Sequence, residues 1–129
     1  MKVRRFRTAE AWKAAFADAK DTYPLDVLPI RLYIIRLWHD PAKEMAHYCY
    51  ILEIGKPFSI YEVWIFDEAT DYPGTGGRYK ESMDRWIKRL KKEAEEKGWD
   101  LKIEEYELPY NIYNLLQVIH YHEYTGLAD

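Results

Sequence analysis

The sequence has very little cysteine and no long apolar run. Its single cysteine, Cys49, excludes an internal disulfide and any cysteine-based zinc motif, which fits a reducing compartment. No apolar run approaches the roughly 20 residues that a membrane-spanning helix needs, and the N-terminal residues lack the pattern of a signal peptide. We therefore expect a cytoplasmic protein without a membrane partner.

Side-chain amides and serine are also scarce, since the chain has two Asn, one Gln and two Ser. Charged residues make up 32% of the chain and hydrophobic residues 48%, which is typical of a globular protein and excludes a disordered one. Few amides beside many Lys, Glu and Arg is a bias of thermophilic proteins, so we expect a thermophilic source. A length of 129 residues predicts one domain, residues 1–129, with a core rich in aromatic side chains.

The stretch from Phe58 to Gly98 organises the chain. It begins with FSIYEVWIFD, which is apolar on both faces except at Glu62 and so predicts an internal strand, with Ile60 and Trp64 on the same face. The sequence EATDYPGTGGR then predicts a glycine-rich turn. The charged segment after this turn carries one apolar stripe, which predicts an amphipathic helix that ends at Gly98.

The remaining elements complete an α+β domain around this stretch. The strand, the helix and a second strand over residues 100–108 normally pair parallel through a right-handed crossover. Thr8 is a good N-cap for a first helix. We predict a five-stranded mixed, mainly antiparallel sheet in the order β-α-β-β-β-α-β-α, with one right-handed βαβ crossover. The other expected elements are strands at 2–7, 31–39 and 45–54, a helix at 9–22, and a terminal segment at 112–124 that fits a helix and also, through VIHYHEY, a strand.

The net charge of −3 is unevenly divided. Residues 1–20 carry six Lys/Arg and two Asp/Glu, and residues 78–99 carry eight and five. Residues 21–77 and 100–129 each have a net charge of −5. If both helices lie on one face of the sheet, that face is expected to be the more positive one.

The glycine-rich turn is the first candidate site. The backbone amides of Gly74, Gly76 and Gly77, with Arg78 and Lys80 at the start of the helix, could hold a phosphate or pyrophosphate. No GK[ST] follows, so this is not a Walker motif. The alternative is a turn that needs glycine only for its geometry.

The element order and this turn resemble the GNAT acyltransferases. Asp71 to Gly76 is similar to their Q/R-x-x-G-x-G motif, although Asp71 stands where the family has Gln or Arg. The resemblance implies acetyl-CoA bound at the Gly74–Arg78 turn. It also implies a catalytic group made of Asn114 and Tyr121, with Tyr121 as general acid. Glu62, an acid within a buried strand face, joins that group as a candidate.

A histidine pair is the second candidate site. His120 and His122 would share one face of a strand and could ligate one metal, as in the HUH single-strand nucleases that this pair resembles. Tyr79 would then be the candidate nucleophile. On a helix the two side chains diverge by about 200° and cannot chelate one ion, which leaves two histidines without a metal.

The last candidate is the basic side of the second helix. Its cations could meet the phosphates of a nucleic acid, together with three arginines of the first strand. The helix residues are Arg85, Lys88, Arg89, Lys91 and Lys92, and the strand residues are Arg4, Arg5 and Arg7. The alternative is a solvated helix face held by ion pairs between neighbouring turns.

The function that we expect first is that of a small intracellular binding or regulatory protein. It would act through a protein or nucleic-acid partner, or by self-association through exposed aromatic residues, and would need no cofactor. A compact acyltransferase that uses acetyl-CoA is the second expectation, and a metal-dependent nuclease the third. The sequence leaves open whether the chain is an enzyme.

Overall fold

The computed structural model describes residues 2–6, 8–22, 26–38, 46–56, 58–71 and 78–109. These residues form the elements in the order β-α-β-β-β-α-β, which confirms the predicted α+β fold. The segment predicted at 112–124 lies outside the described residues. The elements are β1 (Lys2–Phe6), α1 (Ala9–Thr22), β2 (Leu28–Trp38), β3 (Ala46–Lys56), β4 (Ser59–Asp71), α2 (Arg78–Lys97) and β5 (Lys102–Pro109).

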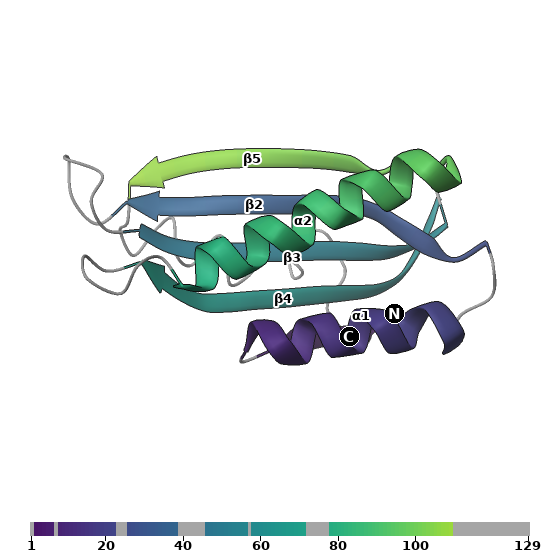
Figure 1. The fold of residues 1–129 in the computed structure, drawn as a ribbon, viewed down its shortest axis with the longest axis horizontal. Coiled ribbons are helices and arrows are strands. Elements are labelled where there is room, and N and C mark those ends of the chain that lie inside the picture. The colour runs from purple at the N-terminus through teal and green to yellow at the C-terminus, as the bar shows by residue number, and fades with distance from the viewer. Residues whose placement is uncertain are drawn as a thin grey trace.

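The five strands form one mixed sheet in the order β1-β4-β3-β2-β5. The two central ladders, β2–β3 and β3–β4, are antiparallel, whereas β1–β4 and β2–β5 are parallel. β4 and β5 run in the same direction but are not neighbours, so α2 crosses obliquely over the strands between them (Figure 1). The expectation that these two strands pair directly was wrong, because β3 and β1 already occupy both edges of β4.

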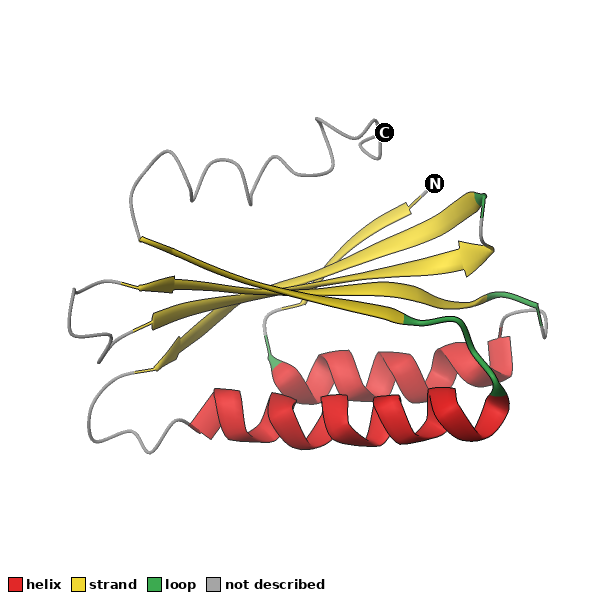
Figure 2. Ribbon diagram, turned by 90° about the horizontal axis from the view of Figure 1, so that it is seen from above, coloured by secondary structure: helices red, strands yellow, loops and turns green. Residues whose placement is uncertain are grey.

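Both helices pack on the same face of the sheet (Figure 2). Their apolar sides and the facing strand residues form the main core, in which Trp12, Trp64 and Met83 are fully buried. The positive charge of this layer lies mainly on α2, because most cations of residues 1–20 belong to β1 and its ends and not to α1. No helix of the described residues is long and apolar enough to cross a membrane.

The ends of the helices follow the predicted capping residues. At the start of α1 the Thr8 hydroxyl accepts a hydrogen bond from the Ala11 amide at 3.1 Å. At the end of α2, Gly98 has a φ of 70°, and the Trp99 amide donates to the Ala94 carbonyl at 2.8 Å. This is a Schellman motif, which satisfies carbonyls that the helix leaves unpaired and directs the chain toward β5.

The central strand differs from its prediction at both ends. β4 continues to Asp71, so the first four residues of the expected turn belong to the strand, where Ala46 of β3 pairs with Asp71. At the other end, Ile54 pairs with Glu62 whereas Gly55 pairs with Ile60. One extra residue on β4 therefore forms a bulge, which moves Ile60 to the sheet face opposite the one expected.

The sheet face opposite the helices carries a second, smaller apolar cluster. Its members are buried to 2% exposure or less, and Ile60 and Ile35 pack beside them. Both faces of the central strands are thus apolar, as the sequence of β4 predicted. The buried members are Cys49, Ile51, Val63 and Ile65.

Candidate nucleic-acid interface

Helix α2 turns one side to the sheet and the opposite side to solvent. Its apolar residues recur at spacings of three and four and are each at most 6% exposed. At about 100° per residue, four of its exposed cations lie within an arc of about 100° on the other side. We call these four residues the cationic surface: Arg85, Lys88, Arg89 and Lys92.

The side chains of the cationic surface line a hollow of about 550 Å³ that is wide open to solvent. Lys92 also lies 4.0 Å from Glu96, but both side chains are largely exposed, so this ion pair contributes little. Among the described residues, Lys88 and Arg89 form no ion pair. The structure therefore brings the four predicted residues together, with their charge directed to solvent.

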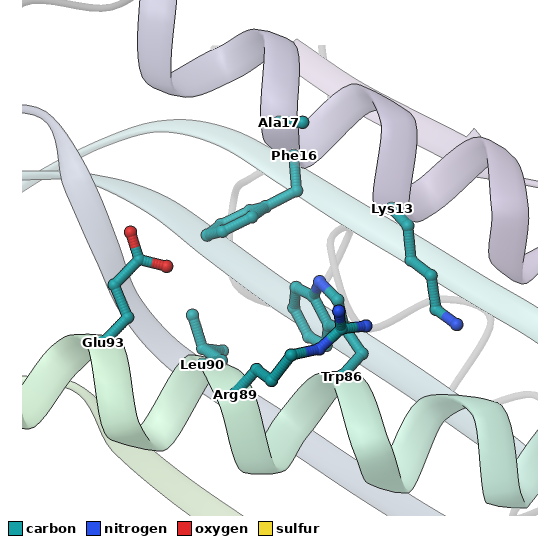
Figure 3. Close-up of a pocket in the computed structure, with 7 residues that line it drawn as sticks. All are labelled: Lys13, Phe16, Ala17, Trp86, Arg89, Leu90 and Glu93. Carbon is teal, nitrogen blue, oxygen red and sulfur yellow. The ribbon is translucent and has the colours of Figure 1, made fainter.

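Helix α1 adds a fifth cation next to this surface. Lys13 faces the side of α2 that carries Arg89 (Figure 3). Partial burial lowers the pKa of the Lys13 ammonium, and the positive charges of Arg89 and Arg85 lower it further, whereas Glu10 raises it. The repulsion among these cations means that an anion placed between them would be favoured electrostatically.

A groove of about 230 Å³ separates α1 from α2 beside Lys13 and Arg89 (Figure 3). Its base is apolar, formed by the largely buried Phe16 and Trp86, whose rings pack edge to face with centroids 5.3 Å apart. Its rim carries the cations of Lys13 and Arg89 on one side and the carboxylate of Glu93 on the other (Figure 3). The inter-helix groove thus has an aromatic base and a rim with two cations and one carboxylate.

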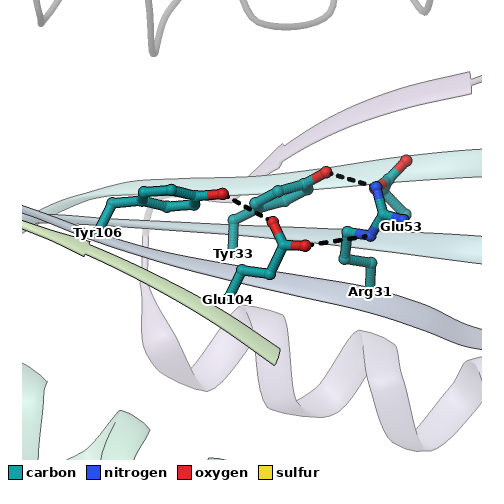
Figure 4. Close-up of polar contacts among 5 residues, drawn as sticks. All are labelled: Arg31, Tyr33, Glu53, Glu104 and Tyr106. Atoms are coloured by element: carbon teal, nitrogen blue, oxygen red, sulfur yellow. Dashed lines mark hydrogen bonds and ion pairs between the residues drawn. The ribbon is translucent and has the colours of Figure 1, made fainter. Parts of the chain in front are cut away.

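The opposite face of the sheet carries a polar cluster (Figure 4). The Nη1 of Arg31 donates to the Tyr33 hydroxyl at 2.9 Å and lies 3.9 Å from Glu53, and the Nε of Arg31 lies 4.0 Å from Glu104. The Tyr106 hydroxyl donates to Glu104 at 2.8 Å, which raises the pKa of Tyr106. Since Glu53 is only 3% exposed, Arg31 supplies the positive charge that a buried carboxylate requires.

Glu62, predicted as a candidate acid, is 8% exposed and faces the helices. One of its oxygens accepts a hydrogen bond from the Trp64 indole at 2.8 Å and lies 4.0 Å from Arg4. The Arg4 guanidinium also lies 5.0 Å above the Trp64 ring. The carboxylate is therefore compensated within the core, by an indole and a cation that hold it in place.

Most of the other predicted site residues cannot be placed. Gly74, Gly76 and Gly77 lie outside the described residues, and so do Asn114, His120, Tyr121 and His122. The backbone of Arg78, Tyr79 and Lys80 forms the first turn of α2, but their side chains are not described. Within the described part of the chain, no group of three or more acidic, His or Cys residues could hold a metal.

The sequence patterns alone did not point to Lys13 or to the Arg31–Glu53 pair. Lys13 follows the apolar Trp12 within one turn of Phe16, a position that borders the buried stripe of α1. Glu53 interrupts the otherwise apolar run YILEI, and this interruption was a usable signal of a buried acid.

Comparison of the chain with protein-family models, with curated proteins and with solved structures gave no match.

Proposed function

We propose that this chain is a small binding protein that docks the phosphate backbone of a nucleic acid on the cationic surface of α2. The observation that carries the proposal is the hollow lined by all four of its cations: Arg85, Lys88, Arg89 and Lys92. Guanidinium and ammonium groups supply charge and hydrogen-bond donors to phosphate oxygens, and this is the sequence-independent part of nucleic-acid binding.

The dimensions of the surface suit this role. From Arg85 to Lys92 the helix rises by about 10 Å, which corresponds to about three nucleotide steps along one strand of B-form DNA. Lys13 extends the positive charge from α2 to the edge of α1. Cations that stay charged at neutral pH position a phosphate and carry out no proton transfer, so the proposed activity is binding and not catalysis.

The test is the double charge reversal Arg85→Glu/Lys88→Glu, measured by fluorescence anisotropy with a labelled oligonucleotide. We expect the affinity to fall by at least about tenfold, because two phosphate contacts become repulsive. The slope of log affinity against log salt concentration should become shallower by about 1.5. The matched control is Arg5→Glu/Lys102→Glu, which makes the same change in net charge at exposed positions of β1 and β5.

The control separates a local surface from the effect of net charge. If both double variants weaken binding equally, the cationic surface has no special role. If the wild-type protein does not bind an oligonucleotide at low salt, the proposal is wrong.

A further inference from the structure

We propose that the inter-helix groove holds one unpaired nucleobase, so that the protein prefers single-stranded nucleic acid to duplex. This inference rests on the proposed function, since it names the form of nucleic acid that the same surface takes. The evidence for it is the shape and the lining of the inter-helix groove, which is separate from the cationic surface of α2 except at Arg89.

The chemistry of the groove matches a base that is joined to a phosphate. Phe16 and Trp86 are each 6% exposed and line its base, with Leu90 beside them. A flat aromatic ring gains dispersion and edge-to-face contact there. Lys13 and Arg89 at one side of the rim carry the charge that the adjoining phosphate needs, and the carboxylate of Glu93 lies at the other side, away from Lys13 (Figure 3).

The volume of the groove limits what can enter. The groove of about 230 Å³ is smaller than the pockets of about 300–1,000 Å³ that usually hold drug-sized ligands. It therefore suits a ligand part of one ring system, such as a single base. Ala17 of α1 lines the groove and has a small side chain. A longer side chain at Ala17 would fill it.

Base pairing and stacking explain the expected preference for single strands. In a duplex each base lies inside the helix, and moving one into a protein pocket costs the energy of unstacking and unpairing. An unpaired strand avoids much of this cost. Proteins that bind single strands combine a positive track for the backbone with aromatic side chains for the bases. Here the two helices supply the cations, and the largely buried rings of Phe16 and Trp86 supply the apolar base of the groove.

The test compares one oligonucleotide sequence as a single strand and as a duplex, with wild-type protein and with Ala17→Leu. We expect the wild-type protein to bind the single strand about fivefold or more tightly than the duplex. Ala17→Leu should remove this preference by weakening single-strand binding alone, and should leave the salt dependence unchanged. The control is Ala14→Leu, the same change at an exposed position of α1 outside the groove.

The outcomes distinguish this inference from the proposed function. Equal affinity for both forms, or equal effects of Ala17→Leu and Ala14→Leu, would overturn the inference that the groove holds a base. Either result would leave the proposed role of the cationic surface intact. Absence of binding to either form would overturn both. Thermal unfolding of the two variants checks that they fold alike.

Discussion

Alanine at Gly55 is expected to destabilise the fold by about 3 kcal/mol or more, because a Cβ atom has no space there. Gly55 lies in β3 opposite the bulge of β4. A Cβ would overlap the Ser59 carbonyl oxygen and lie 2.8 Å from the Tyr61 amide nitrogen and 2.9 Å from the Ile60 Cα. These are backbone atoms of a paired strand, so relief requires the hairpin itself to move.

The control for this variant is Gly98→Ala. A Cβ at Gly98 meets no atom within 4 Å, so its cost is the left-handed backbone alone, about 1 kcal/mol. Urea unfolding followed by circular dichroism measures both variants. A Gly55→Ala protein as stable as the wild type would show that the hairpin does not have this close approach.

Alanine at Trp12 is the second large change, with an expected loss of about 3–5 kcal/mol of unfolding free energy. Trp12 belongs to α1, and its side chain is fully buried against the sheet and α2. Its ring centroid lies 5.6 Å from that of Phe6, 5.8 Å from Trp64 and 5.5 Å from Trp86, in edge-to-face or near edge-to-face contact. Truncation removes all three contacts and leaves a cavity where the two helices meet the sheet.

Phe58→Ala gives the matched control. Phe58 is an aromatic residue that precedes the first residue of β4 and is fully exposed. Its loss should change the stability by no more than about 0.5 kcal/mol. Denaturant unfolding compares the two truncations under identical conditions. Equal effects of the two would contradict the assignment of the Trp12 cluster as the centre of the core.

The sequence predicted the elements well where local signals are strong. Thr8 and Gly98 marked one end of each helix, and the apolar stripe of α2 identified its buried side. The two-sided apolar pattern of residues 59–66 identified an internal strand. These features depend on neighbouring residues along the chain, so the sequence contains the information directly.

The errors concern partners that are distant along the chain. The neighbour of β5 is β2, and only competition among strands for the edges of β4 decides this. The bulge that displaces Ile60 comes from one extra residue of β4 near its first residue, which breaks a simple alternation. Arg31 and Glu53 are 22 positions apart, and only the β2–β3 register places them opposite each other.

The candidate site was predictable in part for the same reason. The four cations of α2 share one side because of helical periodicity, which the sequence shows. Lys13 and the inter-helix groove depend on how α1 lies beside α2, and no local pattern determines this. The phosphate site at the glycine-rich turn and the metal site at the histidine pair stay predictions, since these glycines and histidines lie outside the described residues.

The most direct test of the account is amide chemical-shift mapping by NMR during titration with a single-stranded oligonucleotide. It locates the contact surface without any substitution. We predict that the largest shifts fall on residues 85–92 of α2 and residues 13–17 of α1, and that they diminish as salt is added. Shifts confined to the opposite face of the sheet, around Arg31 and Tyr106, would contradict the account.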